Sequence, residues 1–136
     1  MGNGCSGFSG FNGCHGGEPD FLDLEFTQGT TYVLDCQYFL GAAPLDLSTA
    51  TIYMTGKADY GVPDASALFQ ISTTSGDIAI TDAAQGKFVV TIPPSATAGL
   101  NGLQLRMVYN VMIDLSPNRY PVVMGRIDLL RSSTLT

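Results

Sequence analysis

Apolar residues recur at every second position through most of the chain from Phe21 onward, which is the period of a β-strand. The clearest run spans residues 103–113, where every odd position is apolar and most even positions are polar. Val108 and Met112 are the apolar exceptions on the even face. Further sets share one strand face each: Tyr32, Leu34, Cys36, Tyr38 and Leu40; Ile52 and Met54; Phe88, Val90 and Ile92; and Val123, Gly125, Ile127 and Leu129. A shift of one residue would turn each set toward solvent, so the pattern specifies a single register.

Turn-forming residues separate these runs. Each of the segments 41–44, 74–77, 83–86 and 116–118 contains Gly or Pro, and we expect turns there. Residues 95–100 follow two prolines and are predicted to form one helical turn, with Ser95 as its N-cap and Gly99 as its end. About seven or eight short strands joined by turns predict an all-β fold, an immunoglobulin-like β-sandwich.

The first 20 residues differ from the rest of the chain. They are rich in glycine, which loses much backbone entropy on ordering, so they predict an irregular, flexible Gly/Cys-rich arm over 1–20 before a β-sandwich domain over 21–136. Phe8, Phe11 and the cysteines supply groups that can dock, so we expect the arm to order against a neighbouring subunit. The alternative is a tail that never orders.

The composition is that of a protein packed among neighbours or of an extracellular one. Charged residues make up 13% of the 136 residues, against roughly 25% in average proteins. The hydrophobic content of 45% is too high for a disordered chain. The net charge is −6 and the six Lys and Arg residues are scattered, so we expect no nucleic-acid binding, which requires clustered basic residues.

The sequence also predicts no membrane association. No apolar stretch approaches the roughly 18 residues that span a bilayer, and the N-terminus lacks the basic and then apolar order of a secretory signal. Residues 1–6 match the short myristoylation pattern, but no basic patch supports membrane binding. We therefore expect a protein that stays in the cytosol where it is made, or leaves by lysis or as part of a particle.

The three cysteines favour disulfide chemistry over a metal site. Cys5, Cys14, His15 and Cys36 are zinc-ligand types, but eight residues separate Cys5 from Cys14, whereas structural zinc sites use closely spaced pairs. Any internal bridge leaves one cysteine for a cross-chain bond or a free thiol. Cys36 shares an apolar strand face, which predicts a buried, inert core residue. Cys5 and Cys14 are the candidates for a bridge to each other or to a neighbour. In a compartment that is not reducing, such a bridge would fix the arm in place.

Catalysis, cofactors and small ligands find little support. His15 is the single histidine and lies in the arm, so no catalytic triad on rigid elements is predicted. Asp77 and Asp82 are predicted as solvated surface groups, with calcium ligation as a weaker alternative. Tyr53 and Tyr60 are candidates for a sugar-stacking face, although the chain has no Trp. We expect neither an enzyme nor a bound cofactor or metal.

Short motifs through residues 22–136 resemble a known group of proteins. They are Phe26-Thr27-Gln28-Gly29-Thr30-Thr31; Pro44-Leu45-Asp46-Leu47 leading into a strand at 50–52, with Ser48-Thr49 in place of Thr-Gly; strands at 67–71 and 86–93; a Thr-x-x-Leu turn at 97–100; Val-Tyr-Asn-Val at 108–111; and 125–129. The pattern is similar to that of small β-sandwich proteins encoded among phage tail and baseplate genes, and in layout to the N-terminal domain of siphophage upper baseplate proteins.

The resemblance implies a structural protein of a tailed-phage virion, in the tail, baseplate or neck. Its partners would be other phage structural proteins, and its copies would form a homo-oligomer or ring. Within the same class, a capsid decoration (cement) protein is the alternative; from another class, an adhesin module that binds a host glycan. The candidate assembly and disulfide residues are Cys5, Cys14, Cys36, Phe8 and Phe11.

Overall fold

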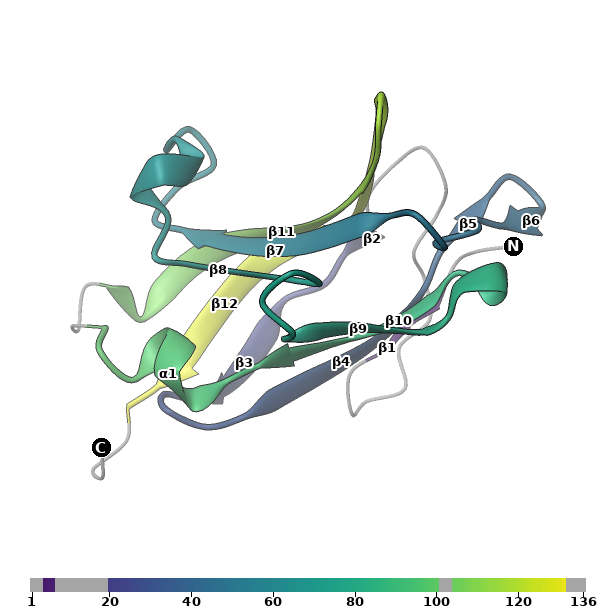
Figure 1. Cartoon of the computed structure of the whole chain (residues 1–136). Helices are drawn as coiled ribbons and strands as arrows, with labels where there is room; N and C mark the ends of the chain where they lie inside the picture. The colour runs from purple at the N-terminus through teal and green to yellow at the C-terminus, as the bar shows by residue number, and fades with distance from the viewer. Residues whose placement is uncertain (1–3, 7–19, 101–103, 132–136) are drawn as a thin grey trace.

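The computed structural model describes residues 4–6, 20–100 and 104–131. Two β-sheets pack face to face, as Figure 1 shows. The small sheet has the order β1-β4-β10-β9, and the large sheet has the order β2-β12-β11-β7-β8, with β3 also paired to β12. The predicted all-β, sandwich-like fold is confirmed.

The strands and helical turns have the following bounds: β1 (Gly4–Ser6), β2 (Asp20–Phe21), β3 (Leu24–Thr27), β4 (Tyr32–Gln37), β5 (Phe39–Leu40), β6 (Ala43–Pro44), β7 (Thr51–Lys57), the 3-10 helix η1 (Asp64–Ser66), β8 (Phe69–Ser72), β9 (Ile78–Asp82), the 3-10 helix η2 (Ala83–Gln85), β10 (Lys87–Ile92), α1 (Pro94–Thr97), β11 (Arg106–Leu115) and β12 (Asn118–Leu130). β5 and β6 form a separate small hairpin, and β2 and β3 run parallel to β12.

The alternating residues form the core between the sheets, as the period of two predicts. The fully or almost fully buried members include Leu34, Cys36, Tyr38, Ile52, Met54, Phe88, Val90, Ile92, Met107, Tyr109, Val111, Ile113, Val123, Ile127 and Leu129. Leu40 is an exception with 43% of its surface exposed. The reason is that β4 ends at Gln37, so Leu40 lies in the β5–β6 hairpin beyond the sheet.

The turn at 83–86 consists of η2 and Gly86, and it requires glycine at its end. Gly86 has φ +68°, a left-handed conformation that favours glycine. A Cβ on Gly86 would also collide with the carbonyl oxygen of Tyr38, which accepts a hydrogen bond from the Leu45 amide. The predicted turn is confirmed, and its glycine is required both by conformation and by space.

The predicted helical turn exists, but its start differs from the prediction. Helix α1 begins at Pro94, with Pro93 in the N-cap position, so Ser95 is inside the helix and makes no capping hydrogen bond. Proline suits the first helical position, because its missing N–H has no partner there and its φ is already helical. The predicted N-cap at Ser95 is therefore wrong.

A buried amide joins two of the motifs that the sequence singles out. Gln28 is 1% exposed, and its Nε2 donates to the carbonyls of Thr97 (3.0 Å) and Leu100 (2.7 Å). The amide of Gly29 donates to the Thr97 hydroxyl at 2.8 Å. The Gln-Gly step after β3 thus anchors the segment that follows α1, and both motifs have a role in the fold.

Part of the predicted arm is regular. Gly4–Ser6 forms strand β1, antiparallel to β4 at an edge of the small sheet, whereas the sequence predicts an irregular segment there. Strand pairing depends on a partner far along the chain, which local composition does not report. Residues 7–19, including Phe8, Phe11, Cys14 and His15, lie outside the described residues.

Candidate functional site

The side of the large sheet that faces away from the core carries the features that favour a binding role. We name it the outer face. It consists of the alternate residues that point away from the core. The central ones are Tyr53, Thr55 and Lys57 on β7; Arg106, Val108, Asn110, Met112 and Asp114 on β11; and Met124, Arg126 and Asp128 on β12. Figure 1 shows the loop that carries η1 and the β11–β12 turn rising at opposite ends of this face.

The loop of residues 58–68 covers one half of the outer face. Register places Lys57, Val108 and Arg126 in one row across β7, β11 and β12. The Tyr60 side chain crosses this row, because its hydroxyl donates to the Gly125 carbonyl on β12 at 3.0 Å. Lys57 pairs with Asp64 in the same loop at 2.6 Å and further ties the loop to the sheet. We name this region the covered half.

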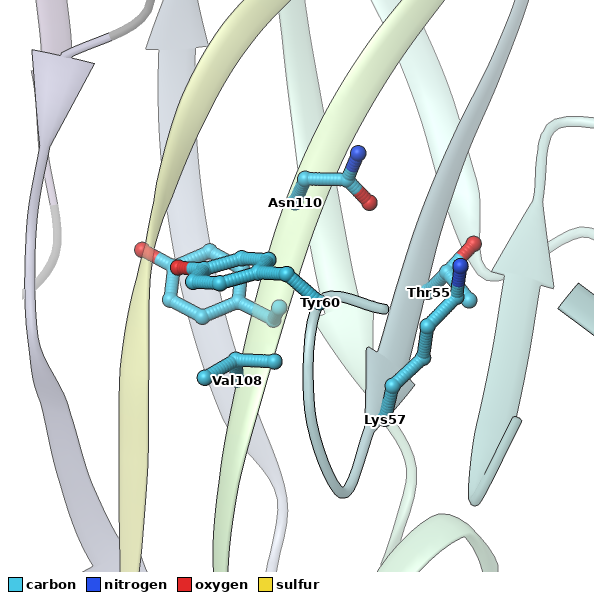
Figure 2. A pocket seen from close by; sticks show the side chains of 6 residues that line it. Thr55, Lys57, Tyr60, Val108 and Asn110 are labelled. Atoms are coloured by element: carbon cyan, nitrogen blue, oxygen red, sulfur yellow. The ribbon is translucent and has the colours of Figure 1, made fainter. Parts of the chain in front are cut away.

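A small recess lies beneath Tyr60. It is lined by Thr55, Lys57, Tyr60, Val108, Tyr109 and Asn110, and its volume is about 50 Å³ (Figure 2). Ligand pockets usually measure roughly 300–1,000 Å³. Space of this size suits one or two water molecules between polar groups. The recess is therefore a packing feature under the loop and too small for a metabolite.

Burial changes the acidity of the tyrosine that closes the recess. It raises the pKa of Tyr60, and the nearby charge of Asp23 adds to the rise. The neutral hydroxyl is thus favoured, and it is the form that donates to Gly125. The covered half is held by a neutral hydrogen bond and an ion pair.

The other half of the outer face carries apolar side chains in two adjacent rows that together span four strands. Met112 on β11 lies opposite Tyr53 on β7 and opposite Pro121 on β12. Met124 lies one row along β12 and beside Phe21 of β2. We name Tyr53, Met112, Pro121, Met124 and Phe21 the apolar band. Three strand-to-strand steps of about 4.8 Å give it a width of about 14 Å.

The apolar band reaches solvent at its β2 end. Phe21 is 71% exposed, the most exposed of the large apolar side chains in the described ranges. The other members of the band are partly exposed. Side chains of this kind aligned across a sheet form a contiguous surface, and such surfaces mark interaction sites more often than scattered apolar residues do.

Polar groups border the band on the side of the β11–β12 turn. The Tyr53 hydroxyl donates to Asp114 Oδ2 at 3.0 Å, and Arg119 Nε lies 3.9 Å from the same oxygen. Burial raises the pKa of Tyr53, and the hydrogen bond to Asp114 adds to the rise. An apolar centre with a hydrogen-bonded polar rim is the usual composition of a protein–protein interface.

The tyrosines predicted for sugar stacking do not form one platform. Tyr53 lies in the row of Met112 and Tyr60 crosses the row of Val108, four residues away along β11, or about 13 Å at the rise of a strand. Both hydroxyls are already hydrogen-bonded within the protein. Asp77 and Asp82 flank opposite ends of β9, about 17 Å apart along the strand, so they do not share a cation.

The cysteine predictions have different outcomes. Cys36 is buried in the core with a free thiol, as its apolar strand face predicts. Burial raises its pKa, and the charge of Asp35 adds to the rise, so the thiol stays protonated at neutral pH. Cys5 lies in β1, and Cys14 lies outside the described residues with Phe8 and Phe11. The docking role of the arm stays a prediction.

Residues 4–6, 20–100 and 104–131 contain no group of three or more His, Cys, Asp or Glu side chains that could hold a metal ion. No helix in these ranges has the length and apolarity needed to cross a bilayer.

The apolar band is not evident from the sequence. The one local sign of it is Met112, an apolar residue on the polar face of the longest alternating run. Val108 gave the same signal but lies under the loop. Pro121, Met124 and Phe21 have no comparable signal, because their place on one face depends on the β-bulge at Val122 and on parallel pairing with β2.

No known family model matches this sequence, and no curated protein matches it significantly.

Proposed function

We propose that this chain is a structural protein of a tailed-phage virion, a tail, baseplate or neck component that docks neighbouring subunits through the outer face. The observation that carries the proposal is the apolar band of Tyr53, Met112, Pro121, Met124 and Phe21. The partner is another phage structural protein or a second copy of the chain in a ring.

The energetics of the outer face support assembly. Burying a large apolar side chain stabilises an interface by about 1.5–3 kcal/mol, and Phe21 has most of its surface still available. The low charged content of 13% reduces the number of ions that must lose water on docking. A face of this kind favours protein contact over small-ligand binding, for which the recess under Tyr60 is too small.

The strand order supports the resemblance to phage β-sandwich proteins. We infer an immunoglobulin-like layout from the strand order. With β1, β4, β7, β9, β10, β11 and β12 lettered A to G along the chain, one sheet has the order A-B-E-D and the other contains G-F-C. β8 then lies beside β7 as the additional C′ strand of the variable type. The motifs at 26–31 and 97–100 are linked by Gln28 within this layout.

Antibodies raised against the purified protein test the location. We expect gold labelling of negatively stained virions at the tail, baseplate or neck. Even labelling over the heads would indicate a capsid decoration protein and overturn the tail assignment. Absence of the protein from intact and disrupted virions, measured by mass spectrometry, would overturn the virion role.

Charge substitutions in the apolar band test the docking face. Phe21→Glu and Met112→Glu are expected to weaken assembly by about 100-fold, since a carboxylate without a partner costs about 3 kcal/mol on burial. Ala79→Glu is the matched control, because Ala79 is exposed on the outer side of the small sheet. The measurement is the copy number of each variant in virions. Wild-type copy number for both band variants, with their circular dichroism unchanged, would exclude this face.

A further inference from the structure

The backbone of the small sheet brings two of the three cysteines together. β1 pairs with β4 in antiparallel register, and this register sets Cys5 directly opposite Cys36. The neighbouring pairs are Gly4 with Gln37 and Ser6 with Asp35. The cysteines are 31 positions apart in sequence, so sequence spacing gives no sign of this pairing.

The hydrogen-bond pattern of β4 determines the type of this pair. The amide of Tyr38 donates to the Gly86 carbonyl at 2.9 Å, in line with the register that sets Cys36 opposite Phe88. Because backbone groups of alternate residues point to the same side of a strand, the amide and carbonyl of Cys36 also point toward β10.

A second bond gives the same result from the other side of β10. The amide of Thr91 donates to the Asp77 carbonyl at 2.8 Å, in the register that sets Val90 opposite Ile78. Thr91 and Val89 therefore direct their backbone groups toward β9, and Phe88 directs its groups toward β4. The Cys5–Cys36 pair thus carries no ladder hydrogen bond, and Gly4–Gln37 and Ser6–Asp35 are the positions that do.

A pair of this type fits a disulfide. Directly opposed residues that are not hydrogen-bonded to each other have Cα atoms about 4.5 Å apart, within the 4.4–6.8 Å range of disulfides and at its short end. Opposed residues also share one face of the sheet. We propose that Cys5 and Cys36 form an intrachain disulfide that locks β1 onto the edge of the small sheet. This inference is independent of the proposed virion role.

The reaction requires an oxidant, for which we name a small-molecule disulfide such as oxidised glutathione. The Cys5 thiolate attacks one sulfur of the oxidant, forms a mixed disulfide and releases one glutathione thiolate. The Cys36 sulfur then attacks the Cys5 sulfur, loses its proton and releases the second glutathione. Two electrons pass from the cysteines to the oxidant, and two protons end on the two glutathione thiols.

The order of attack follows from the environment of Cys36. This side chain is buried, and its raised pKa keeps it protonated at neutral pH, so it is a poor first nucleophile. It reacts in the second step because β1 pairing holds the mixed disulfide opposite it. A bond to Cys36 leaves Cys14 as the third cysteine and excludes the Cys5–Cys14 bridge, one of the two alternatives that the sequence predicts.

Peptide mapping of the wild-type chain tests the bond. The protein is folded, incubated with oxidised glutathione, alkylated and digested with an endoprotease that cuts after Glu together with chymotrypsin. Cleavage after Phe8, Phe11 and Glu18 separates Cys5 from Cys14, and cleavage at Tyr32 and Tyr38 isolates Cys36. We expect a linked peptide pair that contains Cys5 and Cys36, with Cys14 alkylated or linked between chains.

Two single substitutions sharpen the test. Cys14→Ser should lose about 2 Da on oxidation by forming the same bond, and its Tm should rise by about 10 °C, because closing a loop of about 30 residues restricts the unfolded chain. Cys5→Ser is the matched control and should show neither change. A folded Cys14→Ser protein that keeps two free thiols after oxidation, or a wild-type map with only Cys5–Cys14 or cross-chain links, would overturn the proposal.

Discussion

The two halves of the outer face differ in whether an apolar residue is covered by the chain itself. Val108 and Met112 lie on the same strand, on the same face and four residues apart, and both interrupt a polar pattern. Val108 lies under Tyr60, whose hydroxyl is fixed to Gly125. Met112 lies in the apolar band, which extends to an exposed Phe21.

This difference distinguishes an apolar residue that packs against its own chain from one that is available to a partner. An apolar residue on an outer face has two explanations, a covering segment of the same chain or a partner. In the covered half the loop of residues 58–68 is that segment, so Val108 needs no partner. In the other half, the described parts of the chain leave the band open on its outer side, and the proposed partner takes the place that the loop has over Val108.

The largest expected effect comes from filling the space between β12 and Leu22, next to the covered half. A Cβ on Gly125 would collide with the carbonyl oxygen of Leu22, a backbone atom that cannot rotate away. That oxygen accepts the hydroxyl of Tyr109, so its displacement also disturbs a buried hydrogen bond. Gly125→Ala should lower the free energy of unfolding by about 3 kcal/mol, as overpacking does, measured by urea denaturation.

Gly61→Ala is the control for this change. Gly61 lies in the covering loop, and a Cβ there meets no atom within 4 Å. We expect a change of less than about 0.5 kcal/mol. Equal effects of the two substitutions would show that the close approach of β12 to Leu22 is not the cause.

Removing the cover itself should have a smaller effect. Tyr60→Phe loses the hydrogen bond to Gly125 and should cost about 1 kcal/mol. Tyr60→Ala also exposes Val108 and should cost about 2 kcal/mol. Denaturation of both variants gives the two contributions separately. Equal costs would contradict the covering role of the ring. Under the proposed virion role, both variants should assemble like the wild type, because the apolar band is intact.

The smallest effect is a dependence of stability on alkaline pH. Burial raises the pKa of Tyr53, Tyr60 and Tyr109, so the folded protein holds these protons to a higher pH than the unfolded chain does. Their contribution is complete below the unfolded pKa of about 10 and is lost as the pH rises through the folded values. The free energy of unfolding should therefore fall as the pH rises above about 10.

Phenylalanine variants assign this slope to the two halves. Tyr60→Phe reports the covered half and Tyr53→Phe reports the apolar band, and each should make the decline between pH 9 and 11 shallower than in the wild type. Urea denaturation at a series of pH values gives the slopes. A slope unchanged in both variants would assign the alkaline effect to the other groups with raised pKa, Tyr32, Tyr109 and Cys36, instead.

The local pattern of apolar residues and turn glycines is sufficient to predict much of the fold. The alternation along β11 and β12 predicted which side chains are buried, and the turn at 83–86 was predicted from its glycine. The errors lie where local rules compete: Ser95 is a good N-cap type, but Pro94 already suits the first helical position. Leu40 continues the alternation of β4 in sequence, yet the strand has ended before it.

The candidate site was less predictable. Met112 and Val108 are equivalent in sequence, and a loop that returns over one of them decides their difference. Both aromatic, Tyr53 and Tyr60 are candidates for a sugar platform by residue type, but register separates them along β11. The arm was predicted as irregular because glycine dominates it, and Gly4–Ser6 forms a strand because β4 offers an edge.

The sequence by itself determined the all-β class, the inward faces of the long strands and the burial of Cys36, because each depends on a period of two or on residues a few positions apart. Only the tertiary structure decided the order of the strands, the buried link from Gln28 to Thr97, the apolar band across four strands and the register that sets Cys5 opposite Cys36. These features join residues tens of positions apart, and their pairing depends on how the whole chain packs.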